Sequence, residues 1–333
     1  MGALVGARPF SFCGDRAWMR FMRVGAIDIG TNTVLLLVAE PGPDGELRAV
    51  EDHATITRLG QDVDKTRTLH PDAIARTTAC LDAYAGILKR LGVTRVDVVG
   101  TSAMRDAKGG DVVRAHVKRA IGVDARVISG DEEARVSFAG ATSGLGYGEG
   151  SGDVCVFDIG GGSTEVILGA APSTIRFAKS FDVGSVRLTE RHVRTDPPTA
   201  AELALVTADA RAAFAEVPRY GGVPVGVAGT MTTLAAVALG LGTYDGARVH
   251  GLELQTSELR RVVDELAKQT VAERRKVKGL EPKRADVIVA GGQVALALLD
   301  RWGSSAVRIS DRGVRWGIAQ ELARAAQAAQ GGQ

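Results

Sequence analysis

Cysteine is scarce in this sequence, and neither sign of charge is in excess. The three cysteines, Cys13, Cys80 and Cys155, lie far apart and form no CxxC pair. This spacing excludes a disulfide framework and a zinc site, and it is typical of proteins kept in a reducing cytosol. The 41 Lys and Arg residues nearly balance the 39 Asp and Glu residues, which leaves a net charge of +2. We therefore expect no nucleic-acid partner bound through bulk charge.

Long apolar runs and histidine motifs are also missing. No stretch approaches the roughly 20 apolar residues that a membrane-spanning helix needs, so we expect a soluble cytoplasmic protein with no membrane partner. The five histidines include no HExxH motif and no HD dipeptide, which argues against a histidine-based metal site. No pattern of Ser, His and Asp or of Cys and His indicates a nucleophile.

The chain of 333 residues is long enough for two domains. Residues 1–22 are irregular and indicate either a disordered leader or a translation start placed too early. From Arg23 onward strands and helices alternate, as in an α/β fold, and a glycine-rich connector at 140–153 separates two halves that begin alike. The expected strands are 24–27, 34–38, 47–57, 96–99, 125–128, 154–157, 165–168, 223–227 and 307–309. The expected helices are 71–91, 111–121, 200–217, 257–269, a buried helix within 285–303, and a closing helix to about Gln327.

Two short stretches share one pattern: "AIDIGTNTVLL" (26–36) and "VFDIGGGSTEV" (156–166). Each runs from a strand into an aspartate, a glycine turn with hydroxyls, and a second strand, so each turn caps a hairpin and not the start of a helix. Such a turn exposes backbone N–H groups in a concavity that binds phosphate oxygens, and its glycines permit positive φ and close approach. The predicted phosphate-binding residues are Asp28, Gly30, Thr31, Asn32, Thr33, Gly160, Gly161, Gly162, Ser163 and Thr164.

The carboxylates beside these turns require a separate explanation. Asp28 and Asp158 would repel a bare phosphate, but they fit a site in which Mg²⁺ or a water lies beside the phosphate. Glu165 directly follows the second turn, and with Asp158 it would form a two-carboxylate Mg²⁺ site completed by waters and substrate. The alternative for Glu165 is an exposed charge at a strand edge.

The pair of turns resembles the phosphate-binding signature of the actin/sugar-kinase/Hsp70-like superfamily. Within it, the sequence resembles the short, two-domain form of the exopolyphosphatase/guanosine pentaphosphate phosphohydrolase (Ppx/GppA) family, from Arg23 to about Gln320. Seven blocks carry the resemblance, in order: "DIGTNT", "GTSAMRDA", "SGDEEAR", "DIGGGSTE", "GSVRLTE", "AGTMTTLAA" and "SDRGVRWG".

This resemblance implies two ribonuclease-H-like α/β domains around a central cleft, with 23–130 plus 313–330 in the first and 131–312 in the second. The implied enzyme is a phosphoanhydride hydrolase that uses Mg²⁺. It would release terminal phosphate from inorganic polyphosphate or the 5′ phosphate of guanosine pentaphosphate. Its partners would be polyphosphate or guanosine penta- or tetraphosphate as small-molecule ligands, and a homodimer stays open.

The catalytic residues implied by the resemblance are Glu133, in "SGDEEAR", and Arg105, in "TSAMRDA". Asp131 is a natural N-cap of the helix that follows, and acidic residues in a first turn ordinarily compensate the helix dipole. A helix N-terminus should keep Glu133 ionised and a poor base, so we expect it to position the attacking water. Arg105 lies just beyond a strand end, where it could pair with phosphate or form a salt bridge to Asp106 or another surface acid.

Two further segments leave alternatives open. The basic run at 273–286 is either a solvated face or a groove for a long polyanion, with Arg274, Arg275, Lys276 and Lys278 as contacts. Gly229 and Thr230, in "VAGTMTTLAA", lie where a superfamily kinase that uses polyphosphate or ATP would hold its nucleotide. The remaining alternative is a non-catalytic sensor that binds ppGpp or polyphosphate.

Overall fold

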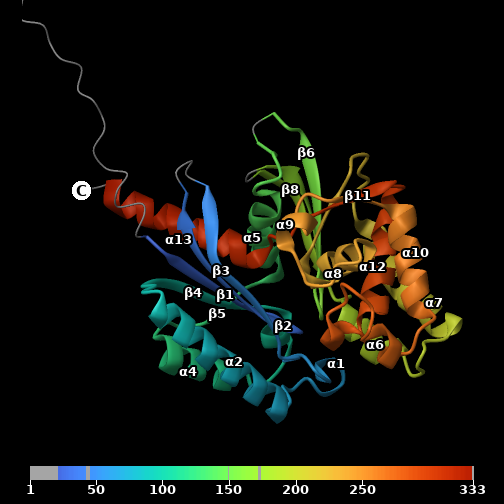
Figure 1. The fold of residues 1–333 in the computed structure, drawn as a ribbon, viewed down its shortest axis with the longest axis horizontal. Coiled ribbons are helices and arrows are strands. Elements are labelled where there is room, and N and C mark those ends of the chain that lie inside the picture. Colours follow the sequence, from blue (N-terminus) through green and yellow to red (C-terminus); the bar gives the residue numbers. More distant parts are fainter. Residues whose placement is uncertain (1–21, 43–45, 149, 172–173, 332–333) are drawn as a thin grey trace, which may run out of the picture.

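The computed structural model of the chain describes residues 22–331 except 43–45, 149 and 172–173. The leader expected over 1–22 therefore lies outside the described residues, apart from Met22, and so does most of the turn expected at 42–45. Two mixed β-sheets organise the molecule. We call the part built on the five-stranded sheet the first lobe and the part built on the six-stranded sheet the second lobe (Figure 1).

The first sheet has the strand order β3-β2-β1-β4-β5. The first three strands form an antiparallel meander, while β4 and β5 run parallel to β1. Every residue of β1 is buried, because helices cover both faces of the sheet. The strands are β1 (Val24–Ile29), β2 (Thr33–Pro41), β3 (Leu47–Ile56), β4 (Arg95–Gly100) and β5 (Arg126–Val127).

The second sheet has the order β10-β11-β9-β6-β7-β8. Apart from β10 it repeats the first sheet: the β6–β7–β8 meander is followed by β9 and β11, which continue the sheet in parallel. The repetition expected from the sequence is thus present in the strand arrangement. The strands are β6 (Asp153–Ile159), β7 (Thr164–Ala170), β8 (Thr174–Phe181), β9 (Val225–Val227), β10 (Glu253–Gln255) and β11 (Ala306–Ile309).

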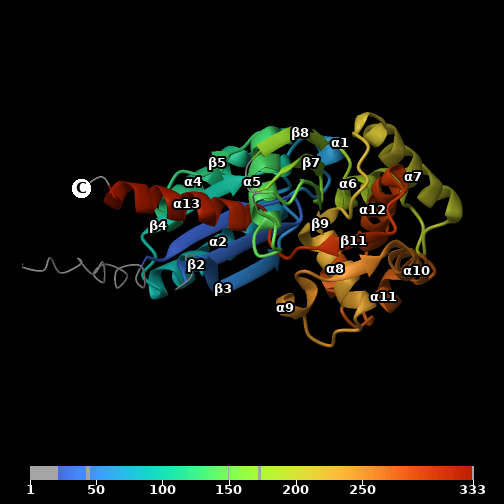
Figure 2. The ribbon, with the colours of Figure 1, turned by 90° about the horizontal axis from the view of Figure 1, so that it is seen from above.

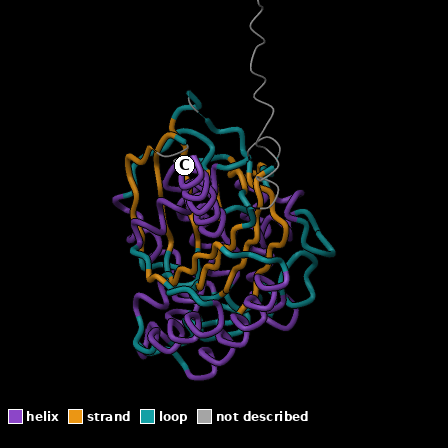
Figure 3. Tube along the Cα trace, turned by 90° about the vertical axis from the view of Figure 1, so that its left-hand side faces the viewer, coloured by secondary structure: helices purple, strands orange, loops and turns teal. Residues whose placement is uncertain are grey.

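Helices cover both faces of each sheet (Figures 1 and 2). In the first lobe, α2 (Pro71–Arg90) and α4 (Gly110–Ile121) pack on the Ile27 and Ile29 side, and α13 (Val314–Gly331) packs on the Ala26 side. Seen from the first lobe, the strands lie between helical layers (Figure 3). In the second lobe, α5 (Gly130–Thr142) covers one face, and the other is covered by α6 (Ser185–His192), α7 (Ala200–Ala213), α8 (Ala228–Ala238), α10 (Thr256–Ala267) and α12 (Ile288–Trp302).

The lobes meet where α13 packs against α5. Glycines permit this close approach, because a Cβ at Gly140 would collide with the Gly313 carbonyl and a Cβ at Gly317 with the Val136 carbonyl. The connector expected at 140–153 is wrong in its first residues, because Gly140 lies inside α5, which continues through Thr142. Four shorter helices, α1 (Val63–Thr66), α3 (Ser102–Asp106), α9 (Gly246–Val249) and α11 (Val271–Arg274), lie in the connections.

The structure also bears on the cysteines and on membrane-spanning helices, within the residues that it describes. Cys80 and Cys155 are buried and free, while Cys13 lies outside the described part of the chain. None of the described helices has the length and apolarity needed to cross a bilayer.

Candidate functional site

The two glycine turns have the same geometry and touch each other. The Gly30 N–H donates to the Thr33 carbonyl at 3.0 Å, and the Gly160 N–H donates to the Ser163 carbonyl at 3.0 Å. A Cβ added at Gly161 would lie 3.1 Å from the Thr31 Cβ. The two hairpin ends, one from each lobe, therefore face each other in direct contact.

Space, and not backbone conformation, explains the glycines of these turns. Gly30 and the three glycines at 160–162 have no positive φ, so of the two properties that glycine permits, these turns use close approach and not a left-handed conformation. A Cβ at Gly162 would lie only 2.5 Å from the Ser102 Oγ, and a Cβ at Gly30 only 2.9 Å from the Thr33 carbonyl. A side chain at Gly30 would therefore collide with its own turn, and one at Gly162 would collide with the first lobe.

A cavity of about 930 Å³ opens around the two turns, between the lobes. Its walls come from both turns, from β3 and from the start of α13, and from three second-lobe segments at 228–233, 241–246 and 279–284. Three carboxylates, those of Asp28, Glu133 and Asp158, line it although each residue is at most 8% exposed. A buried cavity with this many acidic groups is a strong indication of a binding site for cations and charged ligands.

The N-terminus of α5 directs its two glutamates to different places. Ser129 caps the helix, and its Oγ accepts from the Glu132 N–H at 3.1 Å, so the expectation that Asp131 is the N-cap is wrong. Glu132 turns outward to the Arg126 guanidinium, 2.6 Å away. Glu133 turns into the cavity, where the Arg105 Nη1 donates to its Oε2 at 2.7 Å.

Arg105 therefore pairs with a cavity carboxylate, and its Nη1 also donates to the Ile128 carbonyl at 3.1 Å. The salt bridge to Asp106 that the sequence left open is not the contact that forms. The Asp106 carboxylate instead accepts from the Ser102 Oγ and from Arg187. Arg105 does not line the main cavity but a smaller hollow beside it, so it reaches the site only through Glu133 in this conformation.

Burial raises the pKa of every carboxyl group in this cluster. The pKa of Asp28 rises to about 7, chiefly by burial and then by the nearby charge of Asp158. The pKa of Glu133 rises to about 8, because burial outweighs the opposing charge of Arg105. The pKa values of Asp158 and Glu165 are raised by burial as well. The expectation that the helix N-terminus keeps Glu133 ionised is wrong for the metal-free protein, because burial dominates.

The donor set suits a hard divalent cation. The Asp28 Oδ1 is buried without a hydrogen-bond partner, and the Asp158 Oδ2 accepts from the Ser137 Oγ at 2.7 Å. Glu165, the other predicted metal ligand, is only 1% exposed, does not line the cavity, and accepts from the Ser180 Oγ at 2.6 Å. It is therefore not an exposed edge charge. Asp28 and Asp158 fit Mg²⁺ better than Asp158 and Glu165 do.

Within the described ranges, no three or more His, Cys, Asp or Glu side chains are grouped so that they could hold a metal ion. A cation at Asp28 and Asp158 would need further oxygens from waters and from the ligand. Mg²⁺ is usually bound in this way, through one or two carboxylates and substrate phosphates.

The remaining turn residues differ in what their side chains do. The Thr31 hydroxyl and the Asn32 amide are buried without hydrogen-bond partners and line the cavity. Because buried polar groups normally have partners, these two side chains are suited to bind a ligand there. Thr33 and Ser163 also line the cavity. Thr164 does not: its Oγ1 donates to the Val183 carbonyl at 2.6 Å. The assignment of the Thr164 side chain to phosphate binding is therefore wrong, because that hydroxyl is used within the second lobe.

The basic run divides between core, surface and cavity. Arg274 is 2% exposed and donates to the Leu266 and Ala285 carbonyls at 2.8 and 2.7 Å, so its assignment as a polyanion contact is wrong. Arg275, Lys276 and Lys278 are exposed outside the cavity. The cations of the run that line the cavity are Lys283 and Arg284, and neither was predicted as a site residue.

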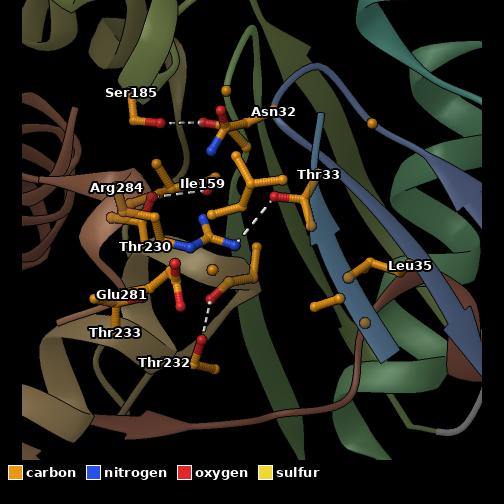
Figure 4. A pocket seen from close by; sticks show the side chains of 18 of the residues that line it. Asn32, Thr33, Leu35, Ile159, Ser185, Thr230, Thr232, Thr233, Glu281 and Arg284 are labelled. Carbon is orange, nitrogen blue, oxygen red and sulfur yellow. Dashed lines mark hydrogen bonds between the residues drawn. The ribbon is translucent and has the colours of Figure 1, made fainter. Parts of the chain in front are cut away.

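Arg284 crosses from the second lobe to the first turn (Figure 4). Its Nη2 donates to the Thr33 Oγ1 at 3.1 Å. Gly229 and Thr230 both line the cavity, but a Cβ at Gly229 would collide with the Arg284 guanidinium, and the Thr230 Oγ1 donates to the Ile159 carbonyl. The Arg284 guanidinium thus packs against Gly229, at the position where a kinase of the superfamily would hold its nucleotide.

Arg315 is a further cavity residue that sequence reasoning missed. Its guanidinium pairs with both oxygens of Asp52, at 2.8 and 3.0 Å, and its charge opposes the rise in the pKa values of Asp28 and Asp158. Arg315 thus compensates Asp28 and Asp158, as Arg105 compensates Glu133. The available signal was a charged residue inside the apolar segment "GVRWGIA" at the start of a helix.

Comparisons with known proteins agree over nearly the whole chain. The sequence model of the Ppx/GppA phosphatase family matches residues 38–325. Exopolyphosphatase 2 of Mycobacterium tuberculosis is 39% identical over 322 residues, which cover 92% of this chain and 100% of that protein. The guanosine-5′-triphosphate,3′-diphosphate pyrophosphatase of Vibrio atlanticus is 28% identical over 302 residues, covering 89% of this chain and 58% of that protein. The crystal structure of the Aquifex aeolicus Ppx/GppA family member has a TM-score of 0.76 and 33% identity, and covers 91% of this chain and 98% of that chain.

Proposed function

The chain belongs to the Ppx/GppA phosphatase family, and on this premise we propose that it hydrolyses phosphoanhydride bonds. The substrates are inorganic polyphosphate, from which it releases the terminal phosphate, and guanosine pentaphosphate, from which it releases the 5′ phosphate. The observation that carries this proposal is the contact of two phosphate-binding turns over a buried cluster of carboxylates. Extending the family resemblance, we propose two ribonuclease-H-like domains around the cleft, 23–130 plus 313–330 and 131–312, in a cytoplasmic enzyme.

The proposed mechanism assigns the turns to substrate binding. The backbone N–H groups and side chains at 31–33 and 161–163 bind neighbouring phosphates of the chain from opposite walls. Arg284 adds a cation on the same side as Thr33. Mg²⁺ held by Asp28 and Asp158 would neutralise charge on the bound phosphoryl oxygens. Preorganised donors of this kind supply most of the acceleration in phosphoryl transfer.

Glu133 positions the attacking water. The water oxygen forms a bond to the terminal phosphorus, the anhydride P–O bond breaks, and the shortened chain leaves with that oxygen. Arg105 orients the Glu133 carboxylate through the 2.7 Å contact. Burial raises the pKa of Glu133, so its ionised form, paired with Arg105, is a stronger base than a solvated glutamate and can also take the proton of the water.

A phosphate-release assay tests the proposal against its two alternatives. The substrates are long-chain polyphosphate, tripolyphosphate and guanosine pentaphosphate, each with and without Mg²⁺, in buffer free of ADP. Mg²⁺-dependent release of phosphate is expected. A kinase would release none without an acceptor nucleotide, and a sensor would bind the substrates without turnover.

Long chains are expected to contact the exposed part of the basic run. We propose that Arg275, Lys276 and Lys278 guide polyphosphate that extends beyond the cavity. Changing all three to Gln should raise KM for long-chain polyphosphate by roughly 3- to 10-fold, since three exposed charges each contribute a fraction of a kcal/mol. KM for tripolyphosphate should stay the same. Initial rates at several salt concentrations measure both.

The matched control removes three exposed cations from the helices of the first lobe, Lys89, Lys118 and Arg119. This variant should leave both KM values unchanged. An equal rise in KM for both triple variants would assign the effect to net charge. If KM changed in neither variant, the basic run would be an ordinary solvated face with no contact to polyphosphate.

A further inference from the structure

The carbonyls of the three glycines at 160–162 all accept hydrogen bonds from the first turn of α6. The Ser185 N–H donates to the Gly160 carbonyl at 3.0 Å, and the Val186 and Arg187 N–H groups donate to the Gly161 carbonyl at 2.9 and 3.0 Å. The Gly162 carbonyl accepts from a side chain, the Arg187 Nε, at 2.6 Å. Because C=O and N–H point in opposite directions in a trans peptide, this fixes the N–H groups of residues 161–163 away from α6, on the opposite edge of the turn.

The same guanidinium joins the turn to the first lobe. Arg187 is 6% exposed, and its Nη1 donates to the Asp64 Oδ1 at 2.7 Å while its Nη2 donates to the Asp106 Oδ2 at 2.8 Å. Asp64 belongs to α1 and Asp106 to α3. Asp106 directly follows Arg105, which contacts Glu133. One side chain thus connects the second phosphate-binding turn with the helix that orients the glutamate.

We propose that Arg187 is a positioning residue that keeps the amides of the second turn in register with Arg105 and Glu133. This inference rests on the proposed function, because it assigns Arg187 to the alignment of that reaction. Only a planar fork of donors can serve three acceptors in fixed directions at once. A lysine keeps the charge beside Asp64 and Asp106 but provides a single ammonium, so it cannot also hold the Gly162 carbonyl in the same geometry.

Arg187→Lys tests this role, with Arg191→Lys as the matched control. Arg191 lies on the same helix and also contacts Asp64, at 3.2 Å, but it does not touch the turn. Arg187→Lys should lower kcat for tripolyphosphate on the order of 10- to 100-fold, since a displacement of about 1 Å in a positioning group costs up to that much. Its KM should change much less than its kcat. Arg191→Lys should retain the wild-type kcat.

A second readout does not depend on turnover. Hydrogen–deuterium exchange of substrate-free protein should be faster at residues 160–164 in Arg187→Lys than in wild type or Arg191→Lys, with equal melting temperatures for the two variants. Wild-type kcat and wild-type exchange in Arg187→Lys would overturn the proposal. If wild type released no phosphate, the proposed function would fail, and exchange alone would decide the role of Arg187.

Asp106→Asn keeps the proposal testable if Arg187→Lys does not fold. This variant weakens the link to α3 but leaves the bond from Arg187 to the Gly162 carbonyl. A lowered kcat with unchanged exchange at 160–164 is expected. Wild-type kcat in Asp106→Asn would overturn the link between Arg187 and Arg105.

Discussion

Glu133→Gln is expected to lower kcat for phosphate release by about 10²–10⁴-fold, with little change in KM. The amide is almost the same size and can still contact Arg105, but it cannot accept a proton from the attacking water. The backbone amides of the turns and the cation site are untouched, so substrate binding should persist. Steady-state kinetics with tripolyphosphate and isothermal titration with the same ligand measure the two effects.

Glu132→Gln is the matched control for this change. Glu132 precedes Glu133 on α5 but points outward to Arg126, at 2.6 Å. It should keep the wild-type kcat to within about twofold, because it touches neither the cavity nor the Arg105 side chain. Equal kcat values for Glu133→Gln and wild type would remove Glu133 from the mechanism.

Asp28→Asn is expected to change stability and activity in opposite directions. The pKa of Asp28 rises from 3.8 to about 7 because the buried, ionised group lies beside Asp158. At pH 8 the metal-free wild type carries this cost in full, so the variant should be more stable by roughly 2–4 kcal/mol. Its Mg²⁺-dependent phosphate release should nevertheless be lost, because a ligand of the proposed cation site is gone.

The sign of the pH dependence follows from the direction of this shift. The folded-state pKa lies above the unfolded value, so stability is fully present below about pH 4 and is lost as pH rises through about 7. The stability difference between Asp28→Asn and wild type should therefore be larger at pH 8 than at pH 5. Mg²⁺ should stabilise wild type more at pH 8 than at pH 5 and should have little effect on the variant.

Urea denaturation at both pH values, with Mg²⁺ or with a chelator, measures these differences. Asp124→Asn is the control, since Asp124 is exposed and pairs only with Lys118. If Asp28→Asn were less stable than wild type at pH 8 without Mg²⁺, ionised Asp28 would not destabilise the fold, and this explanation would be wrong.

The central strands and long helices could be predicted because their sequence patterns follow local physics. The "GAIDI" and "VCVFDI" strands are apolar on both faces, and the buried helix α12 was recognised despite its paired glycines. The edge strands β8 and β10 could not be predicted in the same way. β8 has few fully buried residues, and β10 has only three residues, so neither carries a strong alternating pattern.

The turn residues of the site were found because they are contiguous in sequence and repeat. The side chains that arrive from elsewhere were not found: Arg284, Arg315 and Arg187 belong to other segments, and only the fold brings them beside the turns. Burial was also hidden from the sequence. It turned Arg274 into a core residue, raised the pKa of Glu133, and placed Glu165 against Ser180, away from the cavity wall.

The central claim is that the two turns together hold neighbouring phosphates of one chain. A crystal structure of Glu133→Gln with Mg²⁺ and tripolyphosphate tests it most directly. The account predicts one phosphate on the amides of 31–33, an adjacent phosphate on those of 161–163, and Mg²⁺ between Asp28 and Asp158. A tripolyphosphate bound to one turn alone, or outside the cavity, would contradict it.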